Sequence, residues 1–177
     1  MSGAAPSLIS EAEFLSLPES AEKLELLDGE VIWAPSPSYR HQWALRLIVR
    51  SLEDWGASSK DVTVGMAPLD VRFAPGRILQ PDAFALFKPL PLTHEGPVND
   101  VPELCVEILS SNRAYDRMTK RFVYGEAGVK ELWTVSLDGS SERWFGERLS
   151  ECEATSEQLT SPLLPGYVFD LRALKDG

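Results

Sequence analysis

Two apolar runs constrain the fold of this chain most strongly, because each has a single carboxylate among residues that favour a buried strand. The first run spans residues 78–87 and contains Asp82, and the second is Leu104–Leu109 and contains Glu107. Both have the length, the composition and the Pro- or Gly-bounded ends that are typical of buried strands. An ionised carboxylate there is costly unless a cation or hydrogen bonds compensate its charge. Two such groups on neighbouring strands would suit a divalent metal ion, which takes oxygen ligands.

Within Leu104–Leu109, a strand's period of two places Glu107 on the same face as Cys105 and Leu109. Glu107 could form a structural ion pair with a buried lysine or arginine, or it could ligate a metal ion together with Asp82. The second acid in a strand favours the metal site. Pro81 removes a ladder donor, so we expect Asp82 at a strand end or bulge, where its side chain can be aimed toward a site.

The remaining sequence predicts helices and strands around this pair. A capping box at Ser10 begins a short helix, and Asp28-Gly29 is a hairpin turn between Lys23–Leu27 and Glu30–Ala34. Further elements are a helix over 38–55, strands over 62–66 and 69–73, a helix over 115–127, strands over 131–137 and 143–148, and short strands within 152–174. We therefore expect one domain over residues 1–177 of the α/β class (α+β mixed), with a central mixed sheet flanked by helices and an added β-hairpin region.

The helix predicted over 115–127 has residues spaced four apart along one ridge, with three arginines beside it. The ridge is Asp116, Lys120 and Tyr124, and the arginines are Arg113, Arg117 and Arg121. This is the dense basic cluster of a chain with a net charge of −10, so it is where we expect a phosphate backbone to bind. The alternative is a solvent-facing helix in which Asp116 pairs with Lys120.

At these residues the chain resembles a known nuclease superfamily. Pro81-Asp82 followed by Glu107-Ile108-Leu109 looks like the PD-(D/E)XK motif, with Leu109 standing where the motif has its lysine. An ordered set of segments resembles, more closely, the Uma-type family of restriction endonucleases. These segments are residues 24–30, 35–42, 80–82, 107–110, 116–120, Tyr124 and 127–133.

The resemblance implies a restriction-endonuclease-like core and a Mg²⁺- or Mn²⁺-dependent phosphodiesterase acting on DNA. It implies that Asp82 and Glu107 ligate the metal ion, with the carbonyl of Ile108 as a third oxygen donor. In that family the lysine is thought to have moved from the strand to the following helix, which points to Lys120. The resemblance also assigns Glu25 to the active-site set, although Glu25 could equally be an exposed glutamate on a solvated strand face.

Two features motivate a different hypothesis, a catalytically inactive nuclease-like binding or regulatory module. The family's turn after its glutamate strand contains a proline that Ser110-Ser111-Asn112 lacks. The net charge of −10 also argues against a protein that coats nucleic acid nonspecifically. DNA would bind weakly unless a metal ion or an oligomer, such as a homodimer, supplied further contacts. A hydrolase for small phosphate esters is a third hypothesis.

The rest of the sequence gives few signals about compartment, membrane or metal binding. Cys105 and Cys152 form no C-x-x-C pair, which indicates a reduced, cytoplasmic compartment. The N-terminus lacks a signal-peptide layout and no run is long enough to span a membrane, so we expect a soluble protein with no membrane partner. His41 lies in the first turn of the helix over 38–55 and has no His or Cys at metal spacing, so we interpret it as structural.

Overall fold

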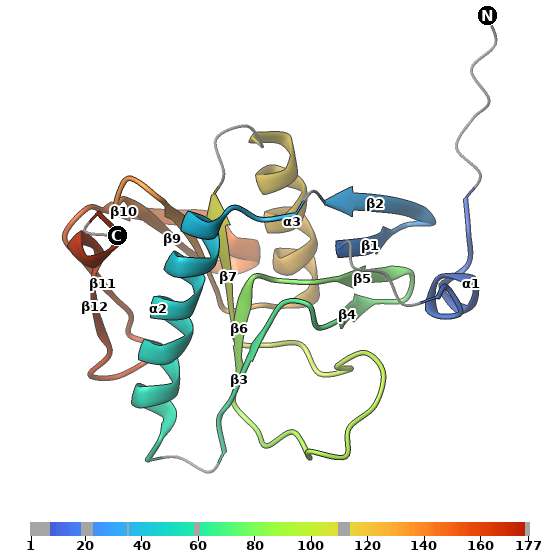
Figure 1. The fold of residues 1–177 in the computed structure, drawn as a ribbon, viewed down its shortest axis with the longest axis horizontal. Coiled ribbons are helices and arrows are strands. Elements are labelled where there is room, and N and C mark those ends of the chain that lie inside the picture. The colour runs from blue at the N-terminus through green and yellow to red at the C-terminus, as the bar shows by residue number, and fades with distance from the viewer. Residues whose placement is uncertain (1–7, 19–22, 35, 59–60, 110–113, 176–177) are drawn as a thin grey trace, which may run out of the picture.

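The computed structural model describes residues 8–18, 23–34, 36–58, 61–109 and 114–175, and a six-stranded sheet forms its centre (Figure 1). The strand order is β10-β9-β8-β7-β6-β3. The bounds are β3 Thr63–Met66, β6 Ala83–Leu86, β7 Leu104–Leu109, β8 Glu131–Ser136, β9 Ser141–Phe145 and β10 Glu151–Thr155. Strands β7 and β8 are parallel and the other neighbouring strands are antiparallel, so the predicted mixed central sheet is confirmed.

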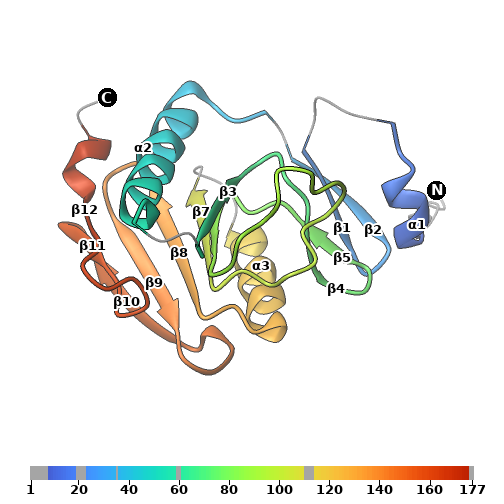
Figure 2. The same ribbon diagram turned by 90° about the horizontal axis from the view of Figure 1, so that it is seen from below.

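Two helices cover opposite faces of this sheet, as Figure 2 shows: α2 (Tyr39–Gly56) on one face and α3 (Ala114–Ala127) on the other. Buried residues of α2 pack with Leu104, Val106 and Ile108 of β7. Cys105 of β7 belongs instead to the core that contains Val123 and Tyr124 of α3. The predicted alternation along β7 is therefore confirmed, and it turns the side chain of Glu107 toward α3.

A smaller sheet, with strand order β2-β1-β5-β4, corresponds to the predicted hairpin region. Its bounds are β1 Lys23–Leu27, β2 Glu30–Ala34, β4 Val71–Ala74 and β5 Arg77–Leu79. The β1–β2 turn has positive φ at both Asp28 (51°) and Gly29 (94°), as a tight hairpin turn requires. Helix α1 (Glu11–Leu15) begins at the capping box of Ser10 and packs Phe14 against this sheet.

The apolar run over 78–87 is divided between the two sheets, so the predicted strand character holds for its two parts and not for the whole run. Strand β5 ends at Leu79 in the small sheet, and β6 begins at Ala83 in the large one. Pro81 has no N–H for a ladder, and the backbone N–H of Gln80 donates to the carboxylate of Glu25 rather than to a strand. The expectation that Asp82 lies at a strand end is confirmed, because Asp82 directly precedes β6.

The C-terminal part forms short strands, as predicted, over the α2 side of the core. Strands β11 (Gln158–Thr160) and β12 (Val168–Asp170) pair with each other, and Leu159 and Phe169 join the core of α2. Two 3₁₀ turns, Glu147–Leu149 and Leu171–Leu174, complete this part. None of the helices described here combines the length and apolar character needed to cross a membrane.

Candidate active site

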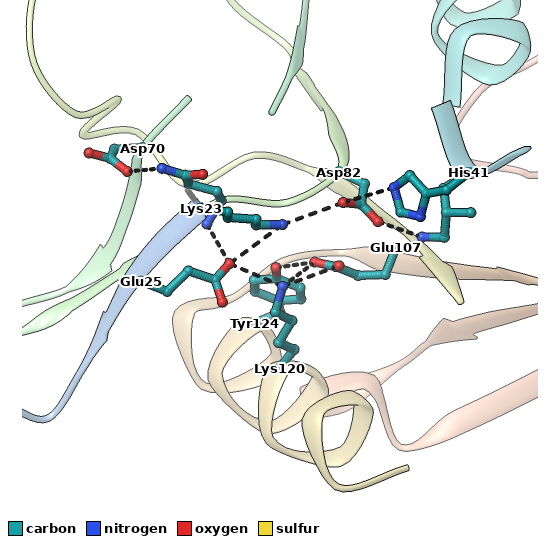
Figure 3. A network of polar contacts seen from close by, with 10 residues as sticks. Lys23, Glu25, His41, Asp70, Asp82, Glu107, Lys120 and Tyr124 are labelled. Atoms are coloured by element: carbon teal, nitrogen blue, oxygen red, sulfur yellow. Dashed lines mark hydrogen bonds and ion pairs between the residues drawn. The ribbon is translucent and has the colours of Figure 1, made fainter. Parts of the chain in front are cut away.

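Charged side chains from both sheets and both long helices meet where β6 begins, beside β7 (Figure 3). Strand β1 contributes Lys23 and Glu25, and the first turn of α2 contributes His41. The remaining members are Asp82 before β6, Glu107 on β7, and Lys120 and Tyr124 on α3. The structure therefore brings together all four predicted catalytic residues, Asp82, Glu107, Lys120 and Glu25, although they are far apart in the sequence.

Asp82 and Glu107 are neighbours across the sheet, because Ala83 and Val106 are paired residues of β6 and β7. One carboxylate oxygen of Asp82, Oδ2, accepts a hydrogen bond of 2.8 Å from the backbone N–H of Ile108. The other, Oδ1, lies 3.4 Å from Lys23 Nζ and 3.6 Å from His41 Nε2. Burial by itself would raise the pKa of Asp82, but His41, Lys23 and Lys120 hold that pKa well below its usual value. Asp82 is therefore a buried, ionised carboxylate.

Glu107 is also buried, but its environment favours the neutral form. Tyr124 Oη donates a hydrogen bond of 2.5 Å to Glu107 Oε1, and Lys120 Nζ lies 3.2 Å from Oε2. Burial raises the pKa of Glu107 to about 7; the charge of Lys120 opposes this rise, and that of Asp82 adds to it. The lysine pairing expected of a structural ion pair is thus present, yet it does not fully offset the cost of burying this charge.

Glu25 and Lys120 are both buried, which decides two alternatives that the sequence left open. Glu25 Oε1 accepts a hydrogen bond of 2.9 Å from the backbone N–H of Gln80 and lies 3.1 Å from Lys120 Nζ. The interpretation of Glu25 as an exposed strand residue was therefore wrong. The solvent-facing alternative for Lys120 was also wrong, because this side chain is shared between Glu25 and Glu107; the side chain of Asp116 lies outside the described residues.

The acids of this cluster outnumber its lysines, so ionisation of Glu107 would leave a net negative charge that a bound cation would offset. Three carboxylates, Glu25, Asp82 and Glu107, face two lysines, Lys23 and Lys120. In the part of the chain that the structure describes, no three His, Cys, Asp or Glu side chains are grouped to hold an ion. The side-chain donors available are the two carboxylates of Asp82 and Glu107; the carbonyl of Ile108 is the third oxygen that the family resemblance implies. This small set suits Mg²⁺, which keeps several waters and commonly binds only one or two protein carboxylates.

Comparison with known proteins identifies the family. The family model Uma2, described as "putative restriction endonuclease", matches residues 11–172. The chain belongs to the Uma2 family. The resemblance noted in the sequence is thereby confirmed.

The Uma2 assignment agrees with the fold of a solved structure. A crystal structure described as a "putative nuclease belonging to DUF820", from Anabaena variabilis ATCC 29413, superposes with a TM-score of 0.80. The two chains are 19% identical, and the match covers 95% of this chain and 98% of the other. At this identity the likeness shows the shared fold and confirms the predicted nuclease-like architecture. No curated protein matches the chain.

Three further residues of this site were not assigned to it from the sequence. His41 was interpreted as structural rather than as a metal ligand, and its Nε2 lies 3.6 Å from Asp82 Oδ1. Lys23 was not singled out, although it lies two residues before Glu25, so the period of a strand places both on one face. The backbone N–H of Gln80 donates a hydrogen bond to Glu25 Oε1, and Gln80 Nε2 donates a hydrogen bond of 2.8 Å to Asp70 Oδ1. No periodic pattern links His41 or Gln80 to the acids, because these contacts are between separate elements.

A cleft of about 320 Å³ is lined by residues of β7, β8, β9, β10 and α3. Leu109 and Thr134 line it, and Thr134 is the register partner of Glu107 on the neighbouring strand. Arg117 of α3 also lines it, and most of the other lining side chains carry hydroxyls: Ser136, Ser140, Ser141, Thr155 and Ser156. Of the other predicted arginines, Arg121 stacks on Trp144 at 3.9 Å from the ring centroid, and Arg113 lies outside the described residues.

Proposed function

We propose that this Uma2-family protein is a divalent-metal-dependent endonuclease that hydrolyses phosphodiester bonds in DNA. The observation that carries the proposal is the pair of buried carboxylates, Asp82 just before β6 and Glu107 on β7, in a cluster of three carboxylates and two lysines. The family description names a restriction endonuclease and the solved neighbour is described as a nuclease, which supports the same reaction class.

Each residue of the cluster has a role in this proposal. Asp82 and Glu107 would hold the ion with the carbonyl of Ile108, and the ion would polarise the phosphate and lower the pKa of a water molecule. Lys120 holds Glu25 and Glu107 in place and orients the attacking water or stabilises charge on the phosphate. Glu25 accepts a hydrogen bond from water at the site. Mg²⁺ and Mn²⁺ are both compatible with these oxygen donors.

The hydroxyl-lined cleft supports a nucleic-acid substrate. It includes Thr134, the register partner of Glu107, and Arg117, so a phosphate backbone in the cleft would meet a cation and several hydroxyl donors, with Glu142 as the one acid among the lining residues that the structure describes. Phosphate contacts of this kind fix the position of a strand without reading its sequence. The chain as a whole is acidic, so binding would depend on this local surface and on the metal ion.

The test is nicking of supercoiled plasmid in Mg²⁺ or Mn²⁺. We expect wild type to convert plasmid to open circles, and Asp82→Asn and Glu107→Gln to lose at least about 100-fold in rate, since each removes a charged oxygen ligand. Asp54→Asn and Glu53→Gln, on the exposed side of α2, are matched controls that should retain the wild-type rate. Absence of nicking by well-folded wild type in either metal would contradict the proposal.

A non-catalytic binding module is the second candidate, and one observation favours it. Lysines already contact all three acids, so the cluster could simply tie β1, β7 and α3 together. Calorimetric titration of Mn²⁺ separates the two candidates. A nuclease site predicts a binding signal in wild type that Asp82→Asn removes, whereas a structural network predicts equal signals in both.

A further inference from the structure

Two lysines reach the acidic cluster; both contact Glu25, and each also contacts one other acid. Lys23 Nζ lies 3.4 Å from Asp82 Oδ1 and 3.7 Å from Glu25 Oε1. Lys120 Nζ lies 3.2 Å from Glu107 Oε2 and 3.1 Å from Glu25 Oε1. Figure 3 shows Glu25 joined to both ammonium groups. Each of the two proposed metal ligands therefore has its own lysine.

The two lysines also differ in their access to solvent. The side chain of Lys23 is 20% exposed, whereas that of Lys120 is 7% exposed. A phosphate that arrives from solvent would thus meet Lys23 first. Its contacts with the acids are longer than those of Lys120, so its attraction to them is weaker. A lysine is also a point charge on a flexible stem, which can change partners without movement of the backbone.

The two oxygens of Asp82 have different partners. Oδ2 is fixed by the backbone N–H of Ile108, whereas Oδ1 faces Lys23 and His41. A divalent ion held by Oδ1 would lie close to the ammonium of Lys23, and two cations at one oxygen repel each other. Lys23 is the longer and more exposed of the two side chains beside Oδ1, so it is the one that can move aside.

We propose that Lys23 is an exchangeable cation of the site. It neutralises Asp82 before metal binds, gives up Oδ1 to the divalent ion, and then donates a hydrogen bond to a non-bridging oxygen of the substrate phosphate. This inference rests on the proposed nuclease function. The sequence assigned both water orientation and charge stabilisation to Lys120, whereas here two lysines share the work. Lys120 stays beneath the site and holds Glu25 and Glu107, while Lys23 stabilises charge on the phosphate.

The first test measures metal affinity in the absence of DNA. Lys23→Met removes the charge and keeps most of the apolar stem; Lys130→Met, an exposed lysine one residue before β8, is the matched control. If Lys23 competes with the ion, calorimetry should show Mn²⁺ binding at least about fivefold tighter in Lys23→Met, with no change in the control. Unchanged or weaker binding in Lys23→Met would overturn the inference.

The second test measures nicking at saturating Mn²⁺. Lys23→Met should be about 100-fold slower than wild type, because a donor to the transition-state charge is lost, and Lys23→Arg should recover much of the rate. An unchanged rate in Lys23→Met would also overturn the inference. If wild type nicks plasmid and Asp82→Asn does not, an unchanged rate in Lys23→Met contradicts the role of Lys23 and leaves the proposed function intact. If wild type neither binds Mn²⁺ nor nicks plasmid, both the proposed function and this inference are contradicted. Thermal unfolding of wild type and Lys23→Met checks that the variant retains the fold. Lys23→Gln is a second neutral variant for both tests.

Discussion

At the scale of single residues, the two central acids have opposite pKa shifts although they are neighbours in the sheet. Asp82 accepts a backbone hydrogen bond and lies near His41 and Lys23, so its pKa is lowered despite burial. Glu107 is buried to a similar extent, but there burial outweighs the attraction of Lys120, so its pKa rises to about 7. A pair whose environments separate its pKa values in this way is typical of functional carboxylates.

The raised pKa of Glu107 makes the stability of the metal-free protein depend on pH. Folded Glu107 keeps its proton up to about pH 7, whereas the unfolded chain releases it near the ordinary glutamate value of about 4.3. The folded state therefore binds more protons between these values, and the free energy of unfolding should fall as pH rises from about 5 to 7. The fall attributable to Glu107 should be on the order of 2 kcal/mol.

Urea unfolding at several pH values, in EDTA, measures this dependence. Glu107→Gln has no proton to lose, so its unfolding free energy should be flatter than that of wild type between about pH 5 and 7. Glu53→Gln, on the exposed side of α2, should follow wild type. Parallel curves for wild type and Glu107→Gln would show that Glu107 is already ionised at pH 5 in the folded state.

At the scale of elements, one stripe of α3 carries buried polar side chains that hold Glu107 and, nearer the start of the helix, an exposed arginine. Lys120 and Tyr124, one turn apart, point into the sheet and hold Glu107. Arg117 lies three residues before Lys120 and lines the cleft beside Glu107, with its side chain exposed. One helix thus supplies the buried support of the acids and an exposed cation at the cleft, which under the proposed function would contact the nucleic acid.

Arg117 should therefore affect DNA binding without affecting the metal site. Arg117→Ala should weaken binding of a short DNA duplex several-fold and reduce the salt dependence of log K by about one phosphate contact. Arg50→Ala, an exposed arginine of α2, is the control and should leave binding unchanged. Fluorescence anisotropy at two or more salt concentrations, in Ca²⁺ to prevent turnover, measures both quantities. Equal loss in the two variants would indicate a nonspecific charge effect rather than a cleft contact.

At the scale of the whole molecule, a second buried charge network joins the central sheet to the C-terminal part. Glu131, the first residue of β8, accepts hydrogen bonds of 2.8 Å from Arg143 Nη1 and 2.7 Å from Ser161 Oγ. Trp133 Nε1 donates to the same carboxylate at 2.9 Å. Arg143 in turn reaches Glu153 of β10. Here the hydrogen bonds satisfy both carboxylate oxygens, which is typical of a structural network.

This network should matter for stability but not for the proposed chemistry. Glu131→Leu leaves the donors of Arg143, Trp133 and Ser161 without this acceptor and should lower the free energy of unfolding by about 3 kcal/mol. Glu131→Gln keeps an acceptor oxygen and should cost less. Urea unfolding measures the difference, and Mn²⁺ affinity below the unfolding transition should be unchanged in both. Equal stability of the two variants would argue against the network as a support of the fold.

The sequence by itself determined the local elements of this protein and the identity of its central acids. The capping box at Ser10, the Asp28-Gly29 turn and the alternation along β7 depend on neighbouring residues, so their physical signals are present in short stretches of chain. A carboxylate within an apolar run is a signal of the same local kind, and so Asp82 and Glu107 could be singled out, although Asp82 lies between two strands rather than in one.

Only the tertiary structure decided where the run over 78–87 breaks between two sheets, and which cations face the acids. The position of Lys23 and His41 beside Asp82 depends on how β1 and α2 pack against β6, and these are contacts over 59 and 41 positions of sequence. Burial of Glu25 likewise requires α3 and Gln80 to close over β1. Such contacts follow from the packing of whole elements, for which no short stretch of sequence carries a signal.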